Sequence, residues 1–200
     1  MADAGLNREA VLTATLDLID RRGGVREVSL RSVARELGCA HTNLYNYVSD
    51  ADQLYWQART HCLAMMVTTV DRQIEQVPGP GARLEALLEG IVAFYLEHPG
   101  WFRLVWLEDL GPQAPDEATA AALRIPALAL GAAVGSAAPH LTRDEADHVA
   151  DILTMYLQGA LSRWLTGRSD ALLDHAAAHH AITSDLHLLF RALSTKEIFR

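Results

Sequence analysis

Hydrophobic residues recur every three or four positions along most of the chain, the spacing that places apolar side chains on one face of an α-helix. No stretch alternates apolar and polar residues in the way that predicts a β-strand. Glycine and proline interrupt the helical spacing at several points, among them Gly23-Gly24, Gly38, residues 77–81 (VPGPG) and residues 98–100 (His-Pro-Gly). The pattern predicts an all-α protein without internal repeats.

The spacing and the interruptions together predict nine helices. Their expected ranges are about 8–22, 30–37, 41–48, 50–76, 82–97, 101–109, 116–138, 143–166 and 169–193. Side-chain oxygens suited to capping stand before several of them, at Asn7, Ser29, Ser49, Thr142 and either Ser169 or Asp170. Pro126 should kink the seventh helix, because proline lacks an amide hydrogen.

Residues 28–54 encode two short helices joined by a tight turn, the arrangement of a helix-turn-helix. The second short helix has an apolar inner face formed by Leu44 and Val48, four residues apart. Its other side chains are polar or amphipathic and mostly point away from that face. We therefore expect this helix to contact another molecule, and DNA explains its polar face better than a hairpin used only for packing.

At these positions the sequence resembles the TetR family of bacterial transcriptional regulators. The resemblance depends on the end of one helix and the recognition helix after it, namely Gly38, Leu44, Tyr45, Tyr47 and Val48. It covers about the first sixty residues, and residues 94–106 (FYLEHPGWFRLVW) resemble a segment of one group of the family's ligand domains. The family implies a TetR-like fold, with a three-helix DNA-binding domain at residues 1–50 and a six-helix effector-binding and dimerisation domain at residues 51–200.

The resemblance also implies a dimer that binds a near-palindromic double-stranded DNA operator. The residues that it assigns to DNA contact are Ser29, Arg31, His41, Thr42, Asn43, Tyr45 and Tyr47. Among these, Asn43 can bond both edge atoms of adenine, and the tyrosine hydroxyls suit phosphate oxygens, although Tyr45 can instead serve packing. The chain departs from the family's usual residues at Ala40, Thr42 and Ala51, so DNA contacts can be weaker or redistributed.

In the family, an effector bound in the larger domain shifts the fourth helix and releases the operator, so a ligand-released repressor is expected. The candidate pocket residues are Met65, Met66, Phe94, Trp101, Trp106, Met155 and Tyr156, which indicate a small apolar or aromatic effector. The candidate dimer residues on the last two helices are Met155, Gly159, Leu161, Leu186 and Leu189. Each of these side chains can alternatively belong to the core of one protomer.

Composition is consistent with a helical regulator in the cytoplasm. Half of the 200 residues are hydrophobic, enough for a sizeable core. The net charge is −8, but the first sixty residues carry seven arginines and eight acidic residues, so the acidity belongs mainly to the rest of the chain. We expect no membrane association, since residues 125–138 are too short to span a bilayer and contain Pro126. Cys39 and Cys62 are expected to be reduced packing residues.

Two other classes of function remain open at this point. A helix-turn-helix protein that contacts other proteins is compatible with Ala40, Ala51 and the net acidity. An all-α enzyme is disfavoured, because no nucleophile, metal or phosphate motif accompanies the scattered histidines. His175 and His179, four residues apart, are more simply explained as solvated or interface side chains than as metal ligands, and no cofactor is expected.

Overall fold

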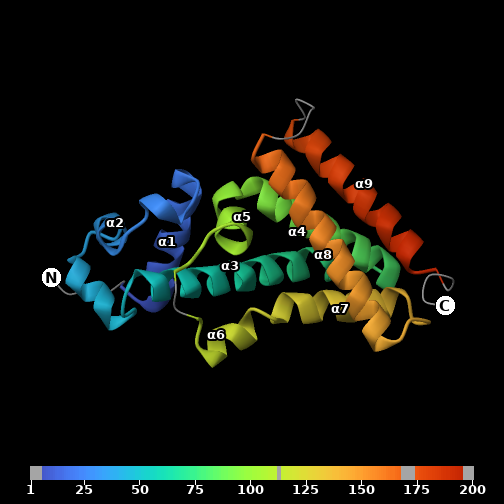
Figure 1. Ribbon diagram of the computed structural model, residues 1–200, viewed down its shortest axis with the longest axis horizontal. Helices are drawn as coiled ribbons and strands as arrows, with labels where there is room; N and C mark the ends of the chain where they lie inside the picture. The colour runs from blue at the N-terminus through green and yellow to red at the C-terminus, as the bar shows by residue number, and fades with distance from the viewer. Residues whose placement is uncertain (1–5, 112–113, 168–173, 196–200) are drawn as a thin grey trace. The chain divides into compact units, whose positions relative to one another are not determined.

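The computed structural model describes residues 6–111, 114–167 and 174–195, and within these ranges it is helical and has no strand (Figure 1). The expected all-α fold is confirmed. The α-helices are α1 (Arg8–Arg22), α2 (Leu30–Glu36), α3 (Ala51–Ile74), α4 (Pro80–Glu97), α5 (Pro99–Trp106), α6 (Glu117–Ala122), α7 (Ile125–Ala137), α8 (Arg143–Leu165) and α9 (His175–Leu193). Two 3₁₀ helices, η1 (Val25–Glu27) and η2 (His41–Asn46), complete the described elements.

Three of the expected helix caps are confirmed. The Asn7 side chain accepts a hydrogen bond from the Ala10 amide at 2.8 Å, and α1 has the predicted bounds. Thr142 and Glu145 form the expected reciprocal capping box at the start of α8. Ser29 caps α2, with its hydroxyl accepting from the backbone of Ser32.

The cap of the long helix α3 differs from the prediction. Asp50, and not Ser49, accepts the hydrogen bond from the Gln53 amide, at 2.8 Å. The Ser49 hydroxyl instead donates to the Asp50 carboxylate at 2.8 Å. A carboxylate is the stronger acceptor at a helix N-terminus, and these hydrogen bonds lower the pKa of Asp50.

Two predicted helices take another form. The predicted recognition helix takes the form of the 3₁₀ helix η2, which follows Ala40 without a side-chain cap. The predicted helix at 116–138 is two helices, α6 and α7, and Pro126 lies in the first turn of α7, where its missing amide hydrogen costs no hydrogen bond. The start expected at Ser169 or Asp170 lies outside the described residues, whereas α9 begins at His175 after an Asp174 cap.

The chain forms two compact units. The first comprises residues 1–65 and 98–123, and the second comprises residues 66–97 and 124–200. Helix α3 contributes its first part to one unit and its last part to the other. Helix α5, which the sequence placed with the larger domain, packs against α1 in the first unit.

The contact between α1 and α5 depends on three residues at the start of α5. His98 Nδ1 lies 2.8 Å from one carboxylate oxygen of Asp20, and the Gly100 amide donates to the other at 2.9 Å. Trp101 donates its indole N–H to the Leu16 carbonyl at 2.9 Å, and its ring stacks on that of His98. A Cβ at Gly100 would lie 2.4 Å from the Asp20 Cα, so the two helices touch where only glycine fits.

The second unit is a helical layer in which α7 packs on α8, and α4 contacts α7, α8 and α9. Its core is formed by fully buried aliphatic side chains, including Leu84, Leu88, Val134 and Leu153. This burial follows the three- and four-residue spacing read from the sequence. The described residues therefore keep the predicted apolar faces inside the layer.

One apolar stretch, Glu117–Ala137, is long enough and hydrophobic enough to cross a membrane by length and composition alone, with a mean hydropathy of 1.5. Core helices of proteins that do not span membranes can have the same length and hydropathy, so one such stretch is weak evidence for a membrane span. In the structure this stretch is divided between α6 and α7.

Gly100→Ala should lower the free energy of unfolding by about 1–3 kcal/mol, because the added methyl group would collide with the α1 backbone. Gly81→Ala is the matched control, since a Cβ at Gly81 meets no atom within 4 Å. Urea unfolding followed by circular dichroism measures both. Equal stability of the two variants would show that the helices do not require this close contact.

Candidate functional site

The turn between α2 and η2 is built by Gly38. It has φ 66°, in the left-handed region that favours glycine. Its amide bonds the Arg35 carbonyl at 3.2 Å, and the Cys39 amide bonds the Ala34 carbonyl at 2.9 Å. This pair of hydrogen bonds is a Schellman motif, which ends α2 and redirects the chain at once into η2.

The 3₁₀ form of η2 sorts its side chains into rows three residues apart. Leu44 is fully buried and packs the element against the domain, while Tyr47, three residues later, is half-buried. Thr42 and Tyr45 form an exposed row, and the Tyr45 side chain is 53% exposed. The element therefore presents polar groups and a phenol to solvent.

Two tyrosine hydroxyls hold this region in place. Tyr47 donates to the Leu6 carbonyl, just before α1, at 2.8 Å. Tyr55, on α3, donates to the Val28 carbonyl, just before the α2 cap, at 2.5 Å. Burial, followed by the charge of Asp52, raises the pKa of Tyr55, so its hydroxyl keeps the proton that it donates.

The predicted DNA-contact residues fall into two groups. Ser29, Arg31, His41, Thr42 and Tyr45 are exposed, and Asn43 is half-buried. Tyr47 differs, because its only hydroxyl hydrogen is directed to Leu6 and cannot also be donated to a phosphate. We therefore reassign Tyr47 from phosphate contact to positioning.

Sequence reasoning missed three residues of this surface. Arg35 is exposed one turn after Arg31 on α2, and Asn46 is exposed three residues after Asn43 on η2. The spacing of these pairs was present in the sequence and could have identified Arg35 and Asn46. Tyr55 could not have been identified, because its partner Val28 is 27 residues away in the chain.

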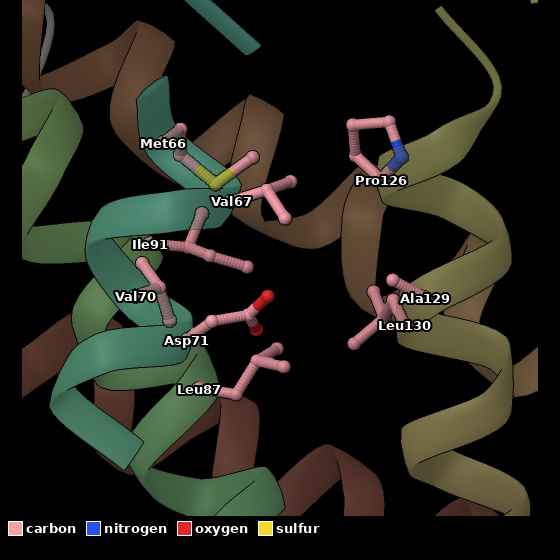
Figure 2. Close-up of a pocket in the computed structure, with 9 residues that line it drawn as sticks. All are labelled: Met66, Val67, Val70, Asp71, Leu87, Ile91, Pro126, Ala129 and Leu130. Atoms are coloured by element: carbon pink, nitrogen blue, oxygen red, sulfur yellow. The ribbon is translucent and has the colours of Figure 1, made fainter. Parts of the chain in front are cut away.

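A narrow cavity lies in the second unit between α3, α4 and α7, and its volume is about 30 Å³ (Figure 2). Eight of its nine lining residues are apolar, and the ninth is Asp71. A wider cavity of about 460 Å³ shares Asp71, Leu87 and Ala129 with it and also reaches Arg83. Because the two cavities share these lining residues, we refer to them together as the α3–α7 groove.

Comparison with known proteins identifies the family of the chain. Residues 84–186 match the family described as the Tetracyclin repressor-like C-terminal domain. That match covers just over half of the chain. The chain belongs to the TetR family of transcriptional regulators.

Solved structures show the same fold at low sequence identity. A protein of unknown function from Rhodococcus sp. RHA1 is 21% identical with a TM-score of 0.76, over 96% of this chain and 97% of that one. A TetR-family regulator from Streptomyces coelicolor is 16% identical with a TM-score of 0.70, over 94% and 96%. The fatty acid degradation regulator FadR from Bacillus halodurans is 12% identical with a TM-score of 0.69, over 100% of both chains. No curated protein of matching sequence was found.

Membership of the TetR family makes the protein a transcriptional regulator and not an enzyme. No group of three or more histidine, cysteine or acidic side chains suited to a metal occurs among the described residues. Cys62 is fully buried, and burial raises the pKa of its thiol, so the thiol remains protonated.

The predicted effector residues of this TetR-family chain are not gathered at the α3–α7 groove. Met66 lines the narrow part of the α3–α7 groove. Phe94 and Trp101 are buried, and Trp101 is engaged with the Leu16 carbonyl. The remaining four are half-buried or exposed and line neither part of the groove: Met65, Trp106, Met155 and Tyr156.

The predicted dimer residues are also divided by burial. Leu161 and Leu186 are 0% exposed within one protomer, so their side chains cannot reach a partner and belong to its core. Met155 is 61% exposed, Gly159 is exposed, and Leu189 is half-buried. Leu188, which the sequence analysis missed, is 66% exposed on α9.

Tyr47→Phe should lower the free energy of unfolding by about 1 kcal/mol, because it removes the hydrogen bond to the Leu6 carbonyl. Tyr45→Phe, on the exposed row of η2, should leave stability unchanged. Thermal unfolding of the two variants in parallel provides the measurement. If Tyr47→Phe proves as stable as the parent protein, its hydroxyl does not hold η2.

Proposed function

We propose that this TetR-family regulator binds a near-palindromic operator as a homodimer, represses transcription there, and releases the DNA when a small molecule binds. The exposed polar row of η2, held by a buried Leu44 and the Tyr47 hydrogen bond, is the observation that carries the proposal. A polar element fixed in this way suits a major groove, where base edges present hydrogen-bonding groups.

Sequence preference is assigned to the start of η2. His41 and Thr42 are exposed, and the half-buried Asn43 is close enough to the surface for its amide to meet an adenine edge. Arg31 and Arg35 lie one turn apart on α2, both exposed, and are suited to phosphate or guanine. Their charge supplies the attraction to DNA that the acidic second part of the chain does not.

Dimerisation is assigned to the exposed faces of α8 and α9. Tyr156 on α8 donates to Asp185 on α9 at 2.5 Å, which brings the exposed edges of the two helices together. Met155 is adjacent to Tyr156, and Leu188 lies one turn after Asp185. Met155 and Leu188 are thus large apolar side chains that are exposed, and Gly159, one turn after Met155, has no side chain. Such a surface favours contact with a second pair of helices.

Release of the DNA is assigned to a movement of α3. This helix is continuous from Ala51 to Ile74 and belongs to both compact units, so a shift produced in the second unit can pass along it to the first. A coupling of about 1–3 kcal/mol would change operator affinity roughly five- to 150-fold. The α3–α7 groove lies against its carboxyl-terminal half.

Asn43→Ala should weaken binding to the preferred operator by about 1–3 kcal/mol and relax the preference at one base pair. The operator is first obtained by selecting bound sequences from a random duplex pool and titrating the selected duplex at two salt concentrations. Tyr45→Phe serves as the comparison on the same element, because loss of a phosphate-contacting hydroxyl should weaken binding to all sequences about equally. An unchanged binding profile for Asn43→Ala would remove this residue from base recognition.

The salt titration also tests the alternative of a protein-contacting adaptor, which is motivated by Ala40 and Ala51. Specific binding that weakens steeply with salt supports an operator-binding regulator, because phosphate contacts release counterions. Absence of any enriched sequence at low salt would favour the adaptor.

The double variant Met155→Glu, Leu188→Glu should dissociate the dimer, because it places four carboxylates in the proposed interface where apolar side chains would meet. Leu128→Glu is the control, since Leu128 is similarly exposed, at 56%, but lies on α7. Sedimentation equilibrium measures the mass of each protein. A double variant that remains dimeric would place the interface elsewhere.

A further inference from the structure

We propose that the α3–α7 groove binds an amphipathic organic cation, with the carboxylate of Asp71 as its charge partner. This inference rests on the proposed function of a ligand-released regulator and adds the chemical class of the ligand. The sequence analysis predicted only an apolar or aromatic effector and did not include Asp71.

Asp71 is the one polar residue that lines the narrow cavity, and it also lines the wider one. Figure 2 shows its carboxylate directed from α3 into the space that faces α7. None of the described side chains or amides forms a hydrogen bond or an ion pair with it. The Asp71 side chain is exposed, and its carboxylate is therefore available to a ligand.

The residues around Asp71 are apolar, and they indicate that the rest of the ligand is apolar as well. Above and below it lie Val67, Val70, Leu87 and Ile91, and Leu130 lies across the groove on α7 (Figure 2). An apolar chain or ring placed there leaves water, while an ammonium group at Asp71 keeps a charged partner. A ligand whose apolar body ends in a carboxylate would meet repulsion at the same point.

Arg83 is the only cationic side chain that lines the groove, and it belongs to the wider part alone. Its guanidinium already donates from Nε and Nη2 to the Val77 carbonyl, at 3.3 and 3.1 Å. The apolar narrow part therefore has a carboxylate and no cation. These positions of the charged side chains favour a ligand with its positive group near Asp71. Arg83 could contact a polar substituent of the ligand in the wider part of the groove.

The volumes indicate how binding would act on the protein. The wide part, at about 460 Å³, is in the range of small-molecule sites, whereas the narrow part, at about 30 Å³, has room for about two water molecules. A longer apolar chain must therefore separate α7 from α3. Because α7 packs against α8 and α4, this separation would also shift α7 relative to those helices, whereas the exposed Leu128 would lose no contact with a covering element.

The test uses the purified full chain and three probes with the same ten-carbon tail, at concentrations below micelle formation. Decyltrimethylammonium carries a cation, decanoate an anion, and decanol no charge. Isothermal titration calorimetry gives each dissociation constant. We expect decyltrimethylammonium to bind most tightly. Asp71→Asn should weaken its binding about two- to fivefold, the range for an exposed ion pair, while decanol binding changes little.

Glu75→Gln is the matched control, because Glu75 is an exposed carboxylate one turn after Asp71 on α3 and lines neither part of the groove. It should leave all three dissociation constants unchanged. Ala129→Trp, at a position shared by both parts of the groove, should abolish binding of the cationic probe while the circular dichroism spectrum stays the same.

Three results would overturn the inference: no binding of decyltrimethylammonium, tighter binding of decanoate with sensitivity to Arg83→Gln, or equal weakening by Asp71→Asn and Glu75→Gln. The titration contains no DNA, so its outcome is independent of whether an operator exists. Adding the cationic probe to the protein–operator complex then asks separately whether binding in the groove releases DNA.

Discussion

The carboxylate of Asp20 fixes the contact on which the first compact unit depends. Its two oxygens accept from the His98 ring and the Gly100 amide, so the end of α1 is held against the start of α5. Because a carboxylate can only accept, His98 must carry its proton on Nδ1. The absence of a side chain at Gly100 allows the backbones to approach, and Trp101 closes the contact by bonding Leu16.

The 3₁₀ helix η2 is stabilised by the residues around it more than by its own hydrogen bonds. It spans six residues in 3₁₀ geometry and begins without a capping side chain at Ala40, so it has little stability alone. Gly38 sets its direction, Leu44 is buried beneath it, and Tyr47 bonds the chain ahead of α1. The lack of a capping side chain at Ala40 is thus compensated by contacts with residues that include one far away in sequence.

The second unit combines a closed core with two different surfaces. Its interior is aliphatic, and Leu161 and Leu186 belong to it. The exposed faces of α8 and α9 carry Met155 and Leu188, whereas the α3–α7 groove has a carboxylate set in an apolar lining. Burial alone separates these roles, because all of the side chains occupy helices with similar periodicity. The proposed function uses both surfaces, one for a second protomer and one for an effector.

The sequence by itself determined the features that depend on local interactions. The bounds of α1, the Asn7 cap and the Thr142–Glu145 box depend on residues within four positions of one another. The TetR resemblance likewise predicted the helix-turn-helix, which is a local pattern. Tertiary structure decided which leucines are enclosed, that α5 joins the first unit, that Tyr47 bonds Leu6, and that Asp71 faces α7. Those outcomes depend on neighbours tens of residues away, and helical periodicity gives the face of a helix but not the element that will cover it.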